Sequence, residues 1–220
     1  MTERLAALAH IAPEGAVVSF GLALVALVTL GLGPLWLGLS LLALAIAVAG
    51  FFRDPDRNAV APIDAVISAA DGKVCDVSEA PIPDAGGEPS RRVAVFMSPL
   101  NVHVNRASVS GKVIRVEHTP GEFRAAYRDD ASEHNEHNVI VISDDRGRRH
   151  AIVQIAGYLA RRIVCRVNPG DHVDRGMRIG LIMFGSRVDH FFPLDYRVKV
   201  AVGDRVRAGE SVLAELPAQG

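Results

Sequence analysis

The chain is poor in cysteine and carries no excess of either charge. Cys75 and Cys165 are its only cysteines, and they do not form a Cys-x-x-Cys pair. This pattern argues against a disulfide framework or a cysteine zinc site, and we expect two reduced, buried thiols, as in a domain that faces the cytosol. The 24 lysines and arginines nearly balance the 25 aspartates and glutamates. Because proteins that bind nucleic acid usually carry a clear basic excess, no nucleic-acid partner is expected.

Charge is absent altogether from residues 15–52, which read GAVVSFGLALVALVTLGLGPLWLGLSLLALAIAVAGFF. One membrane-spanning helix needs about 20 apolar residues, so this stretch is too long for one helix and barely long enough for two. The Gly-Leu-Gly-Pro sequence at 31–34 supplies a break, since glycine and proline end or kink helices. We therefore predict helices over roughly 15–31 and 35–52. They would form a hairpin that crosses or dips into a bilayer, which makes residues 1–52 a membrane-associated segment.

The basic residues around this segment predict its orientation. Arg4 precedes the hairpin, and Arg53 and Arg57 follow it. Basic residues favour the cytoplasmic side, so both ends of the hairpin are expected there, at the inner face of the cell membrane. A cleaved signal peptide fits poorly, because the apolar stretch is too long and no small-residue cleavage site precedes Arg53.

Beyond the hairpin the pattern changes to short β-branched runs. Residues 53–62 are polar and rich in proline, which predicts a linker, and residues 63–220 form the remaining domain. Turn residues separate the runs at regular intervals, which favours a mostly β sandwich or barrel. Only residues 122–136 suggest a short helix or an ordered loop. The predicted strands are 65–68, 73–77, 91–97, 111–117, 138–143, 150–157, 161–167, 178–184, 195–200 and 211–216.

A repeat supports a symmetric β fold. Residues 168–182 and 201–216 share the skeleton Gly-Asp-x-Val-x-x-Gly, in which two turns flank an inward-facing valine. Paired copies of this kind are typical of a biotinyl/lipoyl-like barrel, which raises the alternative of a membrane-anchored carrier or adaptor protein without catalytic activity. A carrier needs an exposed lysine at a hairpin tip, and the chain has only Lys73, Lys112 and Lys199, the last within a strand pattern.

Histidine spacing raises a metal hypothesis that the sequence supports weakly. His134 and His137 lie three residues apart, with Glu133 and Glu136 beside them. Such pairs can bind metal when they share a helix face. No third ligand is evident, and the composition is that of a solvated polar loop, so no metal site is expected.

Three further residues carry a chemical hypothesis only in combination. Asp71 lies in an Asp-Gly turn, and His103 alternates with apolar residues in SPLNVHVNRAS. Ser186 follows Gly185 in LIMFGSRVDHFFP (181–193), where strand-like residues resume at once after the Gly-Ser step. Taken singly, each is better explained as a turn or a structural residue.

Together with their surroundings, these residues resemble a known family. SAADGKV, FMSPLNVHVNR, TPGEF, SEHNEHNVIVI, GYLARRIVCRV and RIGLIMFGSRVDHFFP occur in this order across nearly all of residues 50–220. The set is similar to the pyruvoyl-dependent phosphatidylserine decarboxylases, and most similar to the short bacterial and archaeal type with a hydrophobic N-terminal segment.

The resemblance implies a proenzyme that cuts itself between Gly185 and Ser186. The products would be a large β chain, 1–185, and a small α chain, 186–220, which stay associated. A homodimer of this pair is a further expected assembly. Ser186 would become a covalent pyruvoyl group, the cofactor, which forms a Schiff base with the amine of phosphatidylserine and releases phosphatidylethanolamine and CO2. His103 would be the base that activates Ser186, with Asp71 as its orienting partner. The bilayer is implied as a second partner, because the acyl chains of the substrate stay in it.

The sequence leaves three points of the site open. Longer members of the family carry Tyr-His-x-x-His where this chain has Val102, His103 and, at the second histidine position, Arg106. Both proton-transfer roles would then fall to His103, or one has moved. Archaetidylserine or another aminophospholipid would suit the same chemistry. Charge alone nominates three arginines as partners for phosphate or carboxylate, against the equal alternative of solvated surface residues: Arg161, Arg162 and Arg187.

Overall fold

The computed structural model describes residues 10–58, 60–83, 86–123, 134–157, 162–183 and 185–217. Contacts divide the chain into two compact units, Met1–Asp56 and Arg57–Gly220. The division falls inside the stretch predicted to be a linker.

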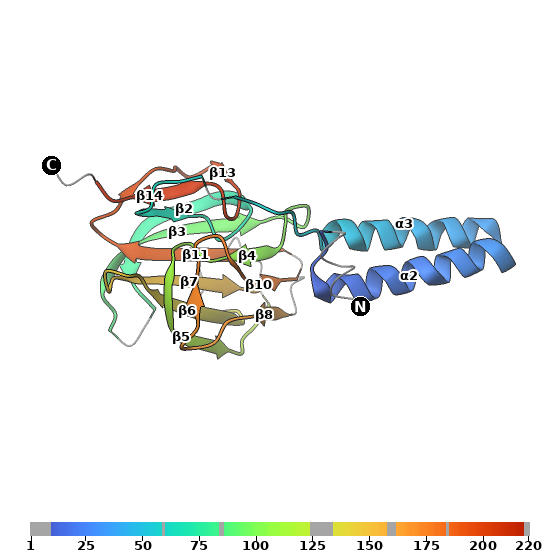
Figure 1. The fold of residues 1–220 in the computed structure, drawn as a ribbon, viewed down its shortest axis with the longest axis horizontal. Helices are drawn as coiled ribbons and strands as arrows, with labels where there is room; N and C mark the ends of the chain where they lie inside the picture. The colour runs from blue at the N-terminus through green and yellow to red at the C-terminus, as the bar shows by residue number, and fades with distance from the viewer. Residues whose placement is uncertain are drawn as a thin grey trace. The chain divides into compact units, whose positions relative to one another are not determined.

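The first unit is an antiparallel pair of helices, α2 (Pro13–Leu32) and α3 (Leu35–Phe51) (Figure 1). The Gly-Pro break separates them: Gly33 caps α2 with an N–H bond of 2.8 Å to the Thr29 carbonyl, and Pro34 caps the start of α3. Glycines allow close packing. A Cβ on Gly15 would lie 2.1 Å from the Phe52 ring, and one on Gly38 would lie 2.6 Å from Leu30. The predicted helical hairpin is confirmed, with helix ends within two residues of those expected.

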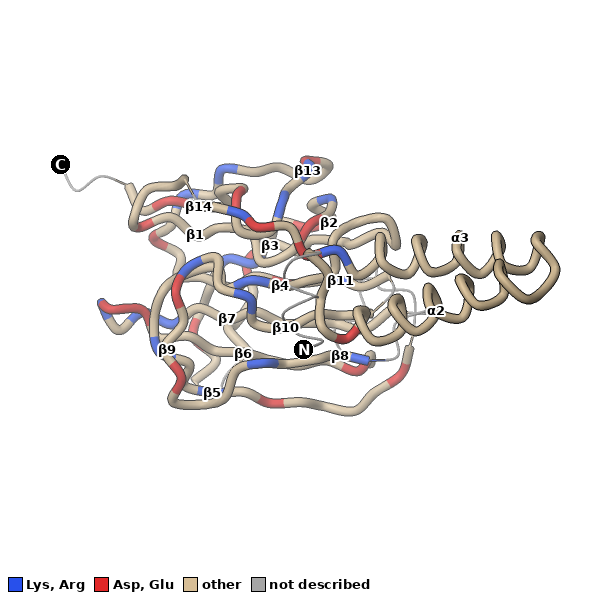
Figure 2. Tube along the Cα trace, turned by 45° about the vertical axis from the view of Figure 1, so that its right-hand side comes forward, with Lys and Arg blue, Asp and Glu red and all other residues tan. Residues whose placement is uncertain are grey.

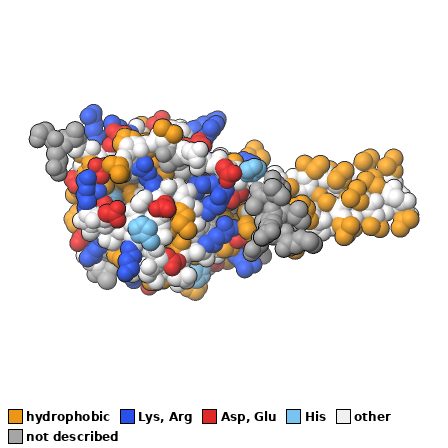
Figure 3. Space-filling model, in the orientation of Figure 1, with side chains coloured by type: hydrophobic (Ala, Val, Ile, Leu, Met, Phe, Trp, Pro, Cys, Tyr) orange, Lys and Arg blue, Asp and Glu red, His pale blue; other side chains and the backbone are white. Residues whose placement is uncertain are grey.

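The outer surface of the pair is apolar. Leu32 is 88% exposed and Trp36 is 69% exposed, at the turn between the helices. Figure 2 marks no charged residue along α3 or along α2 after its first turn, and Figure 3 shows charged side chains spread over the visible face of the second unit. By length and composition α2 is able to cross a membrane, and α3 is a shorter apolar helix. These are the properties expected of a membrane-associated segment.

The second unit is mostly β, as predicted. Its largest sheet has eight strands in the order β13-β2-β3-β11-β7-β6-β5-β9 and curls into a half-barrel (Figure 1). Two three-stranded sheets, β1-β14-β12 and β4-β10-β8, complete the unit. The strands are β1 (Ala65–Ile67), β2 (Gly72–Pro81), β3 (Pro89–Met97), β4 (Val104–Arg106), β5 (Gly111–Thr119), β6 (His137–Ser143), β7 (Arg149–Ile155), β8 (Ile163–Cys165), β9 (His172–Val173), β10 (Arg178–Ile182), β11 (Ser186–Pro193), β12 (Arg197–Val198), β13 (Arg205–Val206) and β14 (Val212–Glu215).

The strand order is that of two matched halves. In the large sheet, β13-β2-β3-β11 mirrors β9-β5-β6-β7, and each half has its own three-stranded sheet. The repeat seen in the sequence supplies β13 and β9 at the two outer edges. Both copies make the same bonds: Val74 N–H to Asp204 O (2.9 Å) in one half, and Val113 N–H to Asp171 O (2.8 Å) in the other.

The match extends to close approaches of the backbone. Gly72 pairs with Val206, and Gly111 pairs with Val173. A Cβ on Gly72 would lie 2.1 Å from Phe96 O, and a Cβ on Gly111 would lie 2.2 Å from Ser143 O. Both positions therefore exclude any other residue. By this equivalence, the end of β3 in one half corresponds in position to the end of β6 in the other half.

Strand β11 lies at the centre of the large sheet, bonded to β3 on one side and to β7 on the other. Its side chains alternate, so Val188 and Phe192 enter the main core while Phe191 joins a smaller cluster on the opposite face. It begins at Ser186 itself. The Gly-Ser step is thus a turn at Gly185 only, and the serine already belongs to the strand.

The helix or loop predicted for 122–136 lies mostly outside the described residues, which resume at 134. Cys75 and Cys165 are free thiols, as predicted, but both are half-buried rather than buried. Burial raises the pKa of the Cys75 thiol, which keeps it protonated near neutral pH.

Candidate functional site

Gly185 and Ser186 form the centre of the predicted site. Gly185 has φ +60°, in the left-handed region, and a Cβ there would have no neighbour within 4 Å. Glycine is therefore favoured here by the backbone conformation, and not by a lack of space for a side chain. Ser186 is fully buried, and its Oγ donates a weak hydrogen bond of 3.4 Å to Sδ of Met97, its partner across the β3–β11 ladder. The hydroxyl thus lies in a buried site directly after a glycine in the left-handed region.

His103 is held by the loop that follows β3. Asn101 Oδ1 accepts both the Ser98 N–H (2.9 Å) and the Ser98 hydroxyl (2.8 Å), which fixes the turn. The buried His103 ring places Nδ1 2.9 Å from Asn101 O. Because a carbonyl only accepts, Nδ1 carries the hydrogen, and Nε2 is the basic nitrogen of the neutral ring. The His103 carbonyl in turn accepts the Ile182 N–H at 3.3 Å, which ties it to the strand that leads to Gly185.

Asp71 reaches the same end of the sheet from the other side of β3. Lys73 pairs with Phe96, so Gly72 lies beside the end of β3 that Ser186 flanks from β11. The Asp71 carboxylate binds both guanidinium nitrogens of Arg57, one at 2.9 Å, and accepts the Ala208 N–H at 2.8 Å. His103 is thus bound by Asn101, and Asp71 is bound by Arg57. The role of Asp71 as orienter of His103 stays a prediction.

Sequence reasoning missed a chain of buried amides beside Ser186. Asn105 Oδ1 accepts Gln154 Nε2 at 2.8 Å, and Gln154 Oε1 accepts Asn138 Nδ2 at 3.0 Å. Asn105 also donates to Met97 Sδ at 3.8 Å, the same sulfur that Ser186 uses. The alternation of His103 and Asn105 was a usable signal. Gln154, in the middle of an apolar run, had none.

The arginines nominated by charge have varied positions. Arg187 is buried and bound through two nitrogens to Asp189, at 2.7 and 3.0 Å. Burial raises the pKa of Asp189 and Arg187 opposes the rise, so the charge of this arginine is engaged inside the protein rather than facing a ligand. Arg162 is exposed, and Arg161 lies outside the described residues.

Arg106, at the second histidine position of the longer relatives, is buried in packing contacts. Its guanidinium donates to Gly176 O at 3.0 Å. A Cβ on Gly209 would lie 2.9 Å from Arg106 Cδ, so the glycine leaves room for the arginine stem. These contacts hold Arg106 between the two repeat turns.

His190 is a buried core histidine with a partner at each ring nitrogen. Nδ1 lies 3.0 Å from Val93 O, and Nε2 accepts the Ala69 N–H at 2.7 Å. Burial lowers its pKa to about 4. The ring is neutral at ordinary pH and joins β11 to the segment before Asp71.

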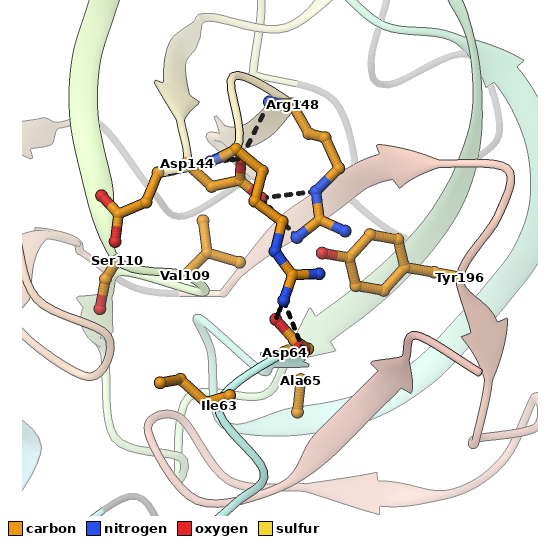
Figure 4. Close-up of a pocket in the computed structure, with 10 residues that line it drawn as sticks. Ile63, Asp64, Ala65, Val109, Ser110, Asp144, Arg148 and Tyr196 are labelled. Atoms are coloured by element: carbon orange, nitrogen blue, oxygen red, sulfur yellow. Dashed lines mark hydrogen bonds and ion pairs between the residues drawn. The ribbon is translucent and has the colours of Figure 1, made fainter. Parts of the chain in front are cut away.

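A pocket of about 240 Å³ lies at the other end of the sheet (Figure 4). Asp144 binds Arg148 at 2.7 Å, and Arg146 binds Asp64 at 3.0 Å. Burial opposes ionisation of Asp144, but hydrogen bonds from His150 and Arg148 outweigh it and hold the pKa well below its usual range. Burial raises the pKa of Tyr196 to about 12, and Arg148 lies 5.0 Å over its ring.

This pocket is separate from Ser186. Ile155, beside Arg187, and Arg149, at the pocket end, are six residue steps apart along β7, which is roughly 20 Å of strand. The end of β6 in one half corresponds to the end of β3 in the other half. The pocket, at the end of β6, is therefore the counterpart of the Ser186 site at the end of β3. In one half a tight β6–β7 hairpin fills this place, whereas in the other half β3 ends and β11 begins there.

In the part of the chain that the structure describes, His134 and His137, the pair considered as metal ligands, do not form part of a ligand set. His137 Nδ1 faces Asn135 O at 2.9 Å. Within the described ranges, no three His, Cys, Asp or Glu side chains lie close enough together to hold an ion. Glu133, the neighbour of His134, is outside those ranges.

The chain matches one family of known proteins over most of its length. Residues 44–214 match the family described as phosphatidylserine decarboxylase. The chain is 46% identical over 166 residues to the phosphatidylserine decarboxylase proenzyme of Magnetococcus marinus, covering 76% of each chain. It is 44% identical to that of Desulfotalea psychrophila (76% of this chain, 78% of the relative) and 49% identical to that of Solidesulfovibrio magneticus (75% and 77%). The chain belongs to the phosphatidylserine decarboxylase family, and the predicted family is confirmed.

Proposed function

We propose that this protein is a self-processing decarboxylase that converts phosphatidylserine to phosphatidylethanolamine and CO2. The observation that carries the proposal is the Gly185–Ser186 step, in which a left-handed glycine precedes a fully buried serine at the start of a central strand. Membership of a family whose relatives are called proenzymes supports it. The membrane-anchored carrier alternative has no observation in its favour, and Lys199 is paired with Glu215 at 2.6 Å.

The self-cleavage uses groups of this chain alone. His103 takes the proton of the Ser186 hydroxyl, Oγ bonds to the Gly185 carbonyl carbon, and the C–N bond to residue 186 breaks as its nitrogen is protonated. β-Elimination then releases the Gly185 carboxylate and leaves dehydroalanine, which water converts to the pyruvoyl group and ammonia. We assign Asp71 as the residue that assists His103, and its place at the same end of β3 supports this role. Asn101 O accepts the His103 Nδ1–H, and Arg57 holds the Asp71 carboxylate.

The surroundings of Ser186 fit a pyruvoyl group. The group has no more heavy atoms than the serine it replaces, the space beside Gly185 is open, and Met97 offers an apolar contact for a methyl. When bound, the group supplies the carbonyl that takes up the substrate amine and the electron sink for loss of CO2. The protein excludes water from this position and holds the strand that carries it.

Cleavage would leave the two chains together. Strand β11 begins at the cut and is bonded along its length to β3 and β7, both in the large chain. In the other half of the sheet, a hairpin joins β6 to β7 at the matching place. A new chain end at Ser186 therefore corresponds to opening that hairpin. The sheet therefore needs no rearrangement to accept it.

The apolar helical pair supports a position at the inner membrane, with the β-rich unit on the cytoplasmic side. The pair presents a continuous apolar surface to lipid, and its two chain ends emerge together beside Arg53. Because phosphatidylserine keeps its acyl chains in the bilayer, an anchored enzyme meets it at high local concentration. We further propose that each matched half derives from a biotinyl/lipoyl-like hairpin unit, which the equivalent turns at Gly170 and Gly203 support.

Intact-mass spectrometry of the detergent-solubilised protein tests the proposal. The wild type should give two chains, the smaller beginning at position 186 with a blocked N-terminus, and should release CO2 from carboxyl-labelled phosphatidylserine. Ser186→Ala should remain one chain. Ser90→Ala is the matched control, since Ser90 is another buried serine of the same sheet. A single uncut wild-type chain, or efficient cleavage of Ser186→Ala, would refute the proposal.

A further inference from the structure

One sulfur atom receives hydrogen bonds from two side chains in the candidate site. Ser186 Oγ donates to Met97 Sδ at 3.4 Å, and Asn105 Nδ2 donates to the same sulfur at 3.8 Å. All three residues are fully buried. The Asn105 amide therefore shares one acceptor with the reacting hydroxyl, and Asn105 lies two residues from His103 along the chain.

The bonds of Asn105 define which way its amide faces. Its oxygen accepts from Gln154 Nε2 at 2.8 Å, and its nitrogen faces Ala69 O at 3.4 Å. A carbonyl only accepts, so the nitrogen must be on the Ala69 and Met97 side. Asn138, bonded to Gln154 Oε1 at 3.0 Å, fixes Gln154 in the matching orientation. The chain of amides holds an N–H donor toward the Ser186 site.

The contact between Gln154 and Asn105 requires a glycine in a neighbouring strand. A Cβ at Gly180 would lie 3.2 Å from Gln154 Nε2 and 2.1 Å from Val164 O. Glycine at this position of β10 therefore lets the amide pass. Held in this way, the Asn105 nitrogen has a long contact with Ala69 O and a weak acceptor in the sulfur, so its capacity to donate is poorly used in the precursor.

Self-cleavage reverses the hydrogen-bonding character of position 186. In the precursor the serine hydroxyl donates to the sulfur. After cleavage the hydroxyl oxygen has left with the Gly185 carboxylate, and the new ketone oxygen on Cα, in place of the backbone nitrogen, has no hydrogen to donate and only accepts. Cutting the 185–186 bond also frees rotation about the remaining Cα–C bond, so the ketone oxygen can settle against a donor. Of the two described side chains that bond Met97 Sδ, Asn105 is the one that still carries a donor.

We propose that Asn105 is a catalytic residue of the mature enzyme, which donates a hydrogen bond to the ketone oxygen at position 186. This inference rests on the proposed function. The bond polarises the carbonyl toward attack by the substrate amine and stabilises the negative charge that develops on oxygen in the transition state. Gln154 acts through Asn105 as a positioning residue.

Asn105→Asp in the full-length, detergent-solubilised protein is the primary test. The substitution keeps an oxygen that accepts from Gln154 and removes the donor. Protein labelled with ¹³C-serine allows isotope-edited infrared measurement of the ketone stretch, which should move to higher wavenumber in the variant. Oxime formation with hydroxylamine, followed by intact mass, should slow about a hundredfold, the lower range for loss of one oxyanion donor.

Two further variants make the test decisive. Gln154→Glu leaves residue 105 intact but offers it only acceptors, so the Asn105 amide should turn its nitrogen toward Glu and the ketone band should again rise. Met97→Leu removes the sulfur and keeps Asn105, so the band should stay in place. A raised ketone band in Asn105→Asp and Gln154→Glu, with an unchanged band in Met97→Leu, supports the proposal. If Asn105→Asp does not cut itself and so forms no ketone, the result for Gln154→Glu decides whether the proposal holds.

Contrary outcomes separate this inference from the function it rests on. A cleaved Asn105→Asp protein with an unshifted band and a normal oxime rate would overturn the role of Asn105 alone. An unshifted band in Gln154→Glu would do the same where Asn105→Asp is uncut. A wild-type protein without any ketone would overturn the proposed function as well.

Discussion

Arg57, the first residue of the β-rich unit, binds the Asp71 carboxylate with both of its terminal nitrogens. Nη1 also donates to Ala208 O at 2.8 Å, while the Ala208 N–H binds Asp71 Oδ1. Both side chains are almost wholly buried. A residue within the predicted linker thus fixes the orientation of a predicted active-site carboxylate and neutralises its charge.

Loss of this pair should damage both folding and processing. Arg57→Gln leaves a buried carboxylate uncompensated, and breaking a buried ion pair from one side typically costs about 3–5 kcal/mol. We expect a loss of this order in urea unfolding of the uncut Ser186→Ala background, and slower self-cleavage in the active background. Arg146→Gln, which breaks the exposed pair with Asp64, should cost about 1 kcal/mol or less. Equal effects of the two substitutions would contradict the importance of the buried pair.

The base assignment predicts slow maturation of His103→Ala. General-base assistance contributes about 10²–10⁴-fold, so the uncut precursor should accumulate and be visible on a denaturing gel over time. His118→Ala is the control, because His118 is largely exposed and pairs with Glu136. If His103→Ala matures at the wild-type rate, another group must take the serine proton.

His190 predicts an acid-sensitive fold. Its pKa is about 4 in the folded state against 6.5 for an ordinary histidine, so the unfolded chain binds the proton more tightly. Stability is unaffected above pH 6.5 and falls as pH drops from 6.5 to about 4, by about 3 kcal/mol in total. His190→Gln in the Ser186→Ala background should lose less stability between pH 7 and pH 4.5 in urea titrations. Parallel pH profiles for the two proteins would show that other groups control the acid response.

The helical pair should matter for lipid access rather than for processing. A protein without residues 1–52 should still cut itself, because the groups assigned to cleavage all lie beyond residue 62. Its turnover of phosphatidylserine in vesicles should fall much more than its turnover of a short-chain analogue dispersed in detergent, because tethering raises the local concentration of the lipid substrate. Side-by-side assays with the full-length protein measure the ratio. Equal rates on vesicles would mean that the anchor does not deliver substrate.

The sequence alone determined the local features. A Gly-Pro break between two apolar runs specifies a helical hairpin, since helix ends depend on a few adjacent residues. Runs of β-branched residues between turns specify strands, and the Gly-Asp-x-Val-x-x-Gly repeat specifies two equivalent turns. The ordered motifs around Gly185 and Ser186 were sufficient to indicate the family.

Only the tertiary structure decided which of these elements meet. The placement of Ser186 between β3 and β7, the pairing of Asp71 with Arg57, and the donor from Asn105 all join segments that are distant or unremarkable in sequence. Strand neighbours are selected by burial and by backbone pairing across the whole domain, which no local pattern encodes. A buried amide such as Gln154 is read as polar in sequence, and its role follows only from the partner that satisfies it.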